Sequence, residues 1–218
     1  MNIEGFRDIL SLINLYVEFI LLPLMAGLVL RKVIKEKQRT GEINYIRFII
    51  ACVFLSFSWT IIWEFLSEKT PLADVIPNQL IGNGTESFGF YNLGIGLMVS
   101  FGILLPLYIT QKETFYYVPF FIFGGMYIYY LFTGYDAWLM NYIELGGIIG
   151  LISLFFVAFR YKDNGSLGLA IFFLFAFLVL ILENIFATLM NSSYIIFGVI
   201  LSLGYFKPFK VEVENKDD

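Results

Sequence analysis

The chain has 218 residues, of which 59% are hydrophobic and 15% charged, and its formal net charge is −4. A soluble domain of this length needs more polar surface to cover its core, so the composition excludes an ordinary soluble protein and predicts a polytopic membrane protein. The absence of histidine excludes a histidine-held haem, the usual catalytic zinc sites and every Ser–His or Cys–His nucleophile pair.

Apolar runs long enough to cross about 30 Å of hydrocarbon recur along the whole chain. They predict an all-α integral membrane protein consisting of one domain, 1–218. The first run lacks the short apolar core and small-residue cleavage site of a signal peptide, so we expect it to be retained. The seven predicted transmembrane helices are 9–30, 45–66, 88–110, 114–133, 138–159, 166–188 and 193–207.

Basic residues predict the orientation. Short loops rich in lysine and arginine stay cytoplasmic, and Lys112, Arg160 and Lys162 fall on the same predicted side as the segment 31–47. The outer segments carry a single basic residue, Lys69. We therefore expect the N-terminus outside and the C-terminus in the cytoplasm, in the plasma membrane. The basic residues of the first inner loop are Arg31, Lys32, Lys35, Lys37, Arg39 and Arg47.

The remaining segments narrow the range of partners. The outer connection 67–87 contains a formal glycosylation acceptor at Asn83, a pattern that often arises by chance, and whether Asn83 is glycosylated stays open.

Cys52 lies in an apolar run and is expected to be a small buried residue. The acidic tail 209–218 argues against nucleic acid as a partner. The expected partners are the lipid bilayer and either a second copy of the chain or a partner subunit.

Two parts of the chain match in residues that membrane helices rarely share. A Gly–Ser–Gly–Pro pattern occurs twice with the same spacing, once as Gly96, Ser100, Gly102 and Pro106, and again as Gly198, Ser202, Gly204 and Pro208. Glutamate is rare within a membrane span, so its recurrence counts for more than matched leucines. Further pairs that align are Glu18 with Glu144, Tyr16 with Tyr142, and Glu64 with Glu183.

These matches predict a 3+1+3 arrangement with a three-helix half at 9–110, a linker helix at 111–137 and a second half at 138–208. The repeats would be parallel, related by an axis along the membrane normal. This organisation resembles that of the SWEET and PQ-loop transporters, although the Pro-Gln dipeptide is missing. The basic first inner loop and Trp59 and Trp63 of the second span are similar to those of seven-helix input modules of sensor kinases.

Acidic residues within the spans are the candidate functional residues. Such residues cost about 2.5–3.5 kcal/mol at the helix centre on insertion scales and usually face protein or water. Glu18 is nearest to mid-membrane, and Glu64 is close to the outer interface. If the halves superpose, the glutamates meet in one outward-facing site. The candidates for substrate or ion binding in that site are Glu18, Glu64, Glu144, Glu183 and Asn184.

Several roles are open to this group. The glutamates are candidates for proton carriers, for ligands of a hard cation, or for partners of an amine-bearing substrate. Tyr16, Tyr142 and Trp63 would aid an amine through cation–π contact. The alternatives are interhelical hydrogen bonds for the deeper acids and contact with headgroup water for those near the interface. The spans offer almost no basic partner, which favours a proton or a ligand cation.

The duplicated glycine pattern has two interpretations. Small residues let helix backbones approach closely, so packing is the first. The second is a pair of hinges, because Pro106 would kink the inner end of its helix. We expect Pro208 to end the last helix.

Three functions remain open. The first is a transporter of a small solute or cation that uses the outer-half glutamates. The second is a membrane-embedded sensor or accessory subunit whose output a partner would carry. The third is an intramembrane lipid-modifying enzyme with paired carboxylates as acid and base, but neither an Asp-rich diphosphate motif nor a Gly-rich phosphate loop is present. We therefore favour a non-enzymatic protein without a cofactor, and the sequence leaves its metal requirement open.

Overall fold

The computed structural model describes residues 3–71, 75–76, 80, 88–182 and 184–209, and the described residues form helices and no strands. The first half contains α1 (Ile3–Thr40), α2 (Tyr45–Lys69) and α4 (Phe88–Ile109). A short 3-10 turn, η2 (Glu113–Phe115), leads into α5 (Val118–Thr133). The chain continues with α6 (Ala137–Tyr161), α7 (Asn164–Ile181) and α8 (Asn184–Leu203).

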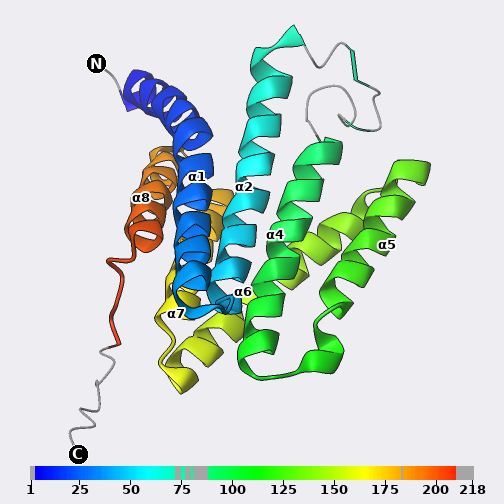
Figure 1. Cartoon of the computed structure of the whole chain (residues 1–218). Coiled ribbons are helices and arrows are strands. Elements are labelled where there is room, and N and C mark those ends of the chain that lie inside the picture. Colours follow the sequence, from blue (N-terminus) through cyan, green and yellow to red (C-terminus); the bar gives the residue numbers. More distant parts are fainter. Residues whose placement is uncertain (1–2, 72–74, 77–79, 81–87, 183, 210–218) are drawn as a thin grey trace, which may run out of the picture.

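Six of these helices close into a ring (Figure 1). Along the ring α1 packs against α2, α2 against α4, α4 against α6, α6 against α7, α7 against α8, and α8 against α1. The remaining helix, α5, lies outside the ring against α4 and α6. Helices that are adjacent in the ring are therefore consecutive along the chain, with two exceptions. The α4 helix packs against α6 although α5 lies between them in the sequence, and α8 packs against α1.

The helices are long and apolar enough for a membrane. Six candidate spans are found among the described residues, and α7 adds a shorter apolar helix at Asn164–Val179. A helix rises about 1.5 Å per residue, so spans of this length cross the hydrocarbon layer. The protein is thus a polytopic, all-helical integral membrane protein. The predicted orientation and the predicted membrane stay predictions.

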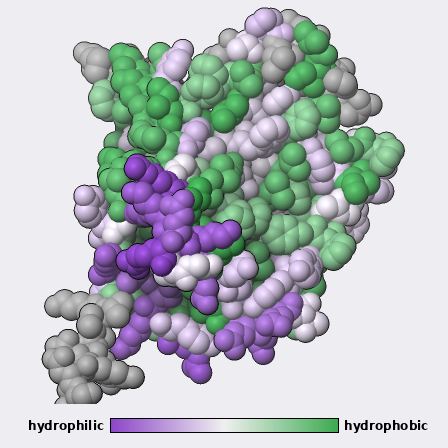
Figure 2. All heavy atoms as spheres, in the orientation of Figure 1, coloured by the Kyte–Doolittle hydropathy of each residue, from purple (hydrophilic) through white to green (hydrophobic). Residues whose placement is uncertain are grey.

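Hydrophilic side chains gather at the end of the bundle where α1 ends and α2 begins (Figure 2). Lys37 and Arg39 lie in the last turn of α1. Arg47, in the first turn of α2, donates from Nη1 to Glu36 Oε2 at 2.6 Å. The α2 helix begins where the Asn44 side chain accepts a hydrogen bond from the backbone N–H of Arg47 at 3.1 Å, which satisfies one N–H of its first turn.

The boundary between the last two helices was predicted wrongly. The sequence placed spans at 166–188 and 193–207, whereas α7 ends at Ile181 and α8 begins at Asn184. The predicted loop contained Asn191 and Ser192, and both lie inside α8. A helix tolerates these polar side chains because they find partners on neighbouring helices or in their own preceding turn.

The last helix ends at a glycine rather than at the predicted proline. Gly204 has a φ of 82°, a left-handed conformation that glycine adopts without steric cost. Its N–H donates to the Leu201 carbonyl at 3.0 Å, and the N–H of Tyr205 donates to the Ile200 carbonyl at 3.2 Å. This is a Schellman motif, so Pro208 lies beyond the helix end. Pro106 lies inside α4, near its C-terminal end.

A polar contact joins α1 to α8. Asn14 is 4% exposed, and its Nδ2 donates to the Thr188 carbonyl at 3.1 Å while its Oδ1 accepts from Ser192 Oγ at 3.1 Å. We expect Asn14→Leu to lower the free energy of unfolding by about 0.6–2 kcal/mol, the range for side-chain hydrogen bonds between membrane helices. Unfolding by sodium dodecyl sulfate in mixed micelles measures this change.

Ser193→Ala is the matched control for this contact. Ser193 Oγ donates to the Leu189 carbonyl of its own helix at 2.8 Å, so its loss should leave the α1–α8 contact unchanged. If Asn14→Leu unfolds at the same fraction of sodium dodecyl sulfate as the wild type, the contact contributes nothing to stability.

Candidate functional site

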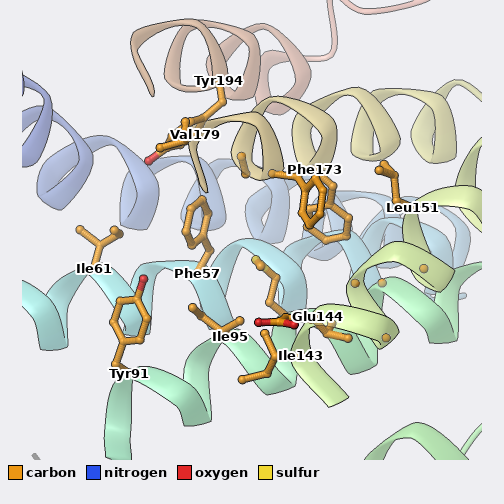
Figure 3. Close-up of a pocket in the computed structure, with 18 of the residues that line it drawn as sticks. Phe57, Ile61, Tyr91, Ile95, Ile143, Glu144, Leu151, Phe173, Val179 and Tyr194 are labelled. Atoms are coloured by element: carbon orange, nitrogen blue, oxygen red, sulfur yellow. The ribbon is translucent and has the colours of Figure 1, made fainter. Parts of the chain in front are cut away.

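A cavity of about 270 Å³ lies inside the ring of helices and is lined by α1, α2, α4, α6, α7 and α8. Figure 3 shows side chains from several of these helices converging on it. Most of the wall is phenylalanine, aliphatic or glycine, and none of the described residues that line it is lysine or arginine. The polar and acidic residues in the wall are Glu18, Glu64, Tyr91, Glu144, Asn191 and Tyr194.

Glu18 is the most buried acid in this wall. Only 4% of its surface is exposed, and the side chains of Tyr194 and Asn191 hydrogen bond to its carboxyl group. Its Oε1 nevertheless has no hydrogen-bond partner among the described residues. A buried carboxyl oxygen without a partner is costly. The sequence analysis predicted Glu18 as a site residue, and the structure places it at the cavity.

Two of the residues next to Glu18 were missed by the sequence analysis. Tyr194 is 4% exposed, and its ring lies 5.6 Å from the ring of Phe57 and 5.6 Å from that of Phe172, measured between centroids. These contacts hold its hydroxyl beside Glu18. Asn191 lies within the stretch that was predicted as a loop. The missed signal is an amide side chain inside an apolar run, which usually faces a polar neighbour.

Glu64 also lines the cavity, and its carboxyl group interacts electrostatically with that of Glu18. The two acids come from α1 and α2, which pack side by side. Tyr91 of α4 also lines the cavity (Figure 3). The structure therefore brings together two of the predicted glutamates in a wall whose described residues include no basic side chain.

Glu144 contributes to another part of the wall. It is exposed, and Figure 3 shows its carboxyl group close to Ile95 and Ile143. Glu144 and Glu18 therefore both line the cavity but differ in exposure, since Glu144 is exposed and Glu18 is buried.

The aromatic residues predicted to assist the acids do not line the cavity. Tyr16 is 48% exposed. Tyr142 Oη donates to the Pro119 carbonyl at 3.0 Å and lies 2.8 Å from Ser100 Oγ, so it joins α4 and α5 to α6. Trp63 is buried with its ring centroid 4.5 Å from that of Phe90.

Two predicted site residues cannot be placed. Glu183 lies outside the described residues, and of Asn184 only the backbone is described, as the first residue of α8. Among the residues that are described, no group of three histidine, cysteine, aspartate or glutamate side chains could hold a metal ion.

The glycines of the duplicated pattern lie in close contacts. A Cβ atom at Gly96 would lie 1.9 Å from the Phe123 ring, and one at Gly198 would lie 2.9 Å from a methionine sulfur of α1. At Gly102, which lines the cavity, a Cβ atom would lie 2.8 Å from the Phe173 ring. Each glycine therefore allows a large side chain to pack against its helix.

Matched positions of the predicted repeat make different contacts. Ser100 Oγ lies 2.8 Å from Tyr142 Oη on another helix, whereas Ser202 Oγ donates to the Val199 carbonyl of its own helix at 2.9 Å. Tyr16, the counterpart of Tyr142, is 48% exposed, and its ring packs edge-on against that of Phe65 on α2. The repeat therefore stays a prediction, and the site is described from its own residues.

The chain matches no family model, no curated protein and no solved structure.

Proposed function

We propose that this protein transports a small solute across the membrane and binds it in the central cavity, with the Glu18 carboxyl as the principal binding group. The observation that carries the proposal is Glu18, which lines the cavity and whose buried Oε1 has no hydrogen-bond partner among the described residues. A site of this kind gains stability when a ligand supplies the missing donor. Acids buried within membrane helices commonly mark substrate or ion pathways.

The position of the cavity supports transport over a purely structural role for Glu18. A polar side chain with a structural role is usually satisfied by neighbouring helices, as the Asn14 amide is by Thr188 and Ser192. Glu18 instead keeps one oxygen without a partner in the described part of the chain, beside a second acid, Glu64. Binding sites in transporters are formed between helices near the bilayer midplane, where their rearrangement exposes the site to either side.

Uptake by proteoliposomes tests this proposal. The probes are radiolabelled methylammonium, phenethylamine, leucine and glucose, which differ in charge and size. We expect saturable uptake of at least one probe above that of protein-free liposomes. Glu18→Gln should reduce this uptake at least tenfold, because the amide cannot carry the charge and presents one acceptor oxygen in place of two.

Glu113→Gln is the matched control, since Glu113 lies in η2 and is exposed. Its uptake should equal that of the wild type. Uptake no faster than in protein-free liposomes for every probe would contradict transport. So would equal uptake by wild type and Glu18→Gln.

A further inference from the structure

The charge of the cavity indicates the class of its solute. Glu18 and Glu64 share one wall, and no basic side chain among the described lining residues offsets them. We propose that the solute is a small protonated amine with an apolar body, bound with its ammonium group at Glu18. This inference rests on the proposed function, because it names the solute class for the same cavity.

The requirement for an N–H group follows from the state of Glu18. Oε1 has no hydrogen-bond donor among the residues that the structure describes, whereas the carboxyl group already has Tyr194 and Asn191 as hydrogen-bonding neighbours. A protonated amine supplies both a donor and the opposite charge, and charge-assisted hydrogen bonds are roughly twice as strong as neutral ones. A quaternary ammonium ion supplies charge but no donor, so it should bind more weakly.

An aromatic pair adds a second recognition element. Phe57 and Tyr194 both line the cavity, and their ring centroids are 5.6 Å apart. Tyr194 also hydrogen bonds to Glu18, so a cation at the carboxyl lies next to these rings. Cation–π attraction in such a position adds to the charge-assisted hydrogen bond.

The rest of the wall accommodates the body of the ligand. It consists largely of apolar side chains such as Ile95, Met98 and Phe177, with glycines on α4 and α6. A dry cavity of about 150 Å³ holds benzene. The cavity here measures about 270 Å³, so one aromatic ring and a short aminoalkyl chain fit.

Other charged ligands fit this cavity less well. An anion would meet the carboxyl groups of Glu18 and Glu64 without a basic partner in the described wall. A hard metal ion takes six or more oxygen ligands, whereas the described residues hold no group of three acids or other metal-binding side chains that could bind one. The apolar body of an organic amine matches the rest of the lining.

Isothermal titration calorimetry on the full chain in detergent micelles tests the solute class. The probes are phenethylamine, its quaternary trimethyl derivative, phenethyl alcohol and hydrocinnamate, which share one ring and differ in charge and donors. Titration into empty micelles corrects for partitioning. We expect phenethylamine to bind wild type at least tenfold more tightly than each of the other probes. Glu18→Gln should weaken phenethylamine binding at least tenfold, and Glu113→Gln should leave it unchanged.

Equal binding of amine and alcohol would overturn the inference, as would unchanged amine binding by Glu18→Gln. A circular dichroism melt confirms that Glu18→Gln is folded, and Glu18→Asp provides a second variant that keeps the charge. Glu18→Asp should retain more binding than Glu18→Gln. Uptake of leucine or glucose without amine binding would contradict the solute class while leaving transport intact. Amine binding without uptake would contradict transport, favour a sensor, and leave the solute class intact.

Discussion

Replacing Gly94 with valine is expected to lower the free energy of unfolding by about 3 kcal/mol or more, at the upper end of the cost of overpacking a core. Gly94 is buried where α4 meets α2. A Cβ atom there would lie 2.1 Å from Thr60 Oγ1, 2.9 Å from the Ser56 carbonyl oxygen and 3.0 Å from the Thr60 backbone nitrogen. Two of these three atoms are backbone, so relief requires α2 to move as a whole.

Unfolding by sodium dodecyl sulfate in mixed micelles measures the loss of stability caused by Gly94→Val. Gly94→Ala keeps the test informative if the valine variant does not fold, because it adds only the Cβ atom and should still be clearly destabilised. Adding Thr60→Ala should recover part of that loss by removing the nearest atom. Gly27→Val is the matched control, since a Cβ atom at Gly27 meets nothing within 4 Å. A Gly94→Ala protein as stable as wild type would show that α2 and α4 do not approach this closely.

Replacing Gly147 with leucine is expected to weaken phenethylamine binding at least tenfold, which corresponds to about 1.4 kcal/mol, while the protein stays folded. Gly147 lines the cavity, and a Cβ atom there meets only the Val99 Cγ2 atom, at 3.9 Å. The backbone therefore tolerates the substitution, and the leucine side chain extends into the space that the ligand needs. Calorimetry with phenethylamine measures the effect.

Two variants accompany Gly147→Leu. Gly147→Ala should have an intermediate effect, because it fills less of the cavity. Gly125→Leu introduces the same side chain on α5, outside the cavity, where a Cβ atom meets nothing within 4 Å. It should bind phenethylamine like the wild type. Wild-type binding by Gly147→Leu would place the amine outside this cavity.

The helices could be predicted from the sequence because the bilayer imposes length and polarity on each span independently of its neighbours. Runs of apolar residues therefore indicated the long helices. Two boundaries were wrong, because α1 continues to Thr40 through most of the segment predicted as the first inner loop, and α7 and α8 meet earlier than predicted. The boundary between α7 and α8 depends on tertiary contacts. Asn191 and Ser192 lie inside α8, where their side chains hydrogen bond to Glu18 and Asn14 of α1. The order of polar and apolar residues along one segment does not show which side chains of another helix it will contact.

The candidate site was predicted in part for a similar reason. An acid within an apolar run is costly wherever it lies, so Glu18, Glu64 and Glu144 were found from sequence, and all three line the cavity. Tyr194 was missed because a tyrosine in a membrane span is common. Its role depends on packing against Phe57 and on its hydrogen bond to Glu18.

The sequence by itself determined that this is a membrane protein, where its apolar helices lie, and which acids within them are unusual. Each of these follows from the cost of transferring a single segment into hydrocarbon. Only the tertiary structure decided which side chains meet. The closure of α8 against α1 brings Asn191 and Tyr194 to Glu18, which lines the cavity while its Oε1 finds no partner in the described part of the chain. Contacts between residues this far apart depend on helix rotation and register, and those are set by packing between whole helices rather than by the composition of any one of them.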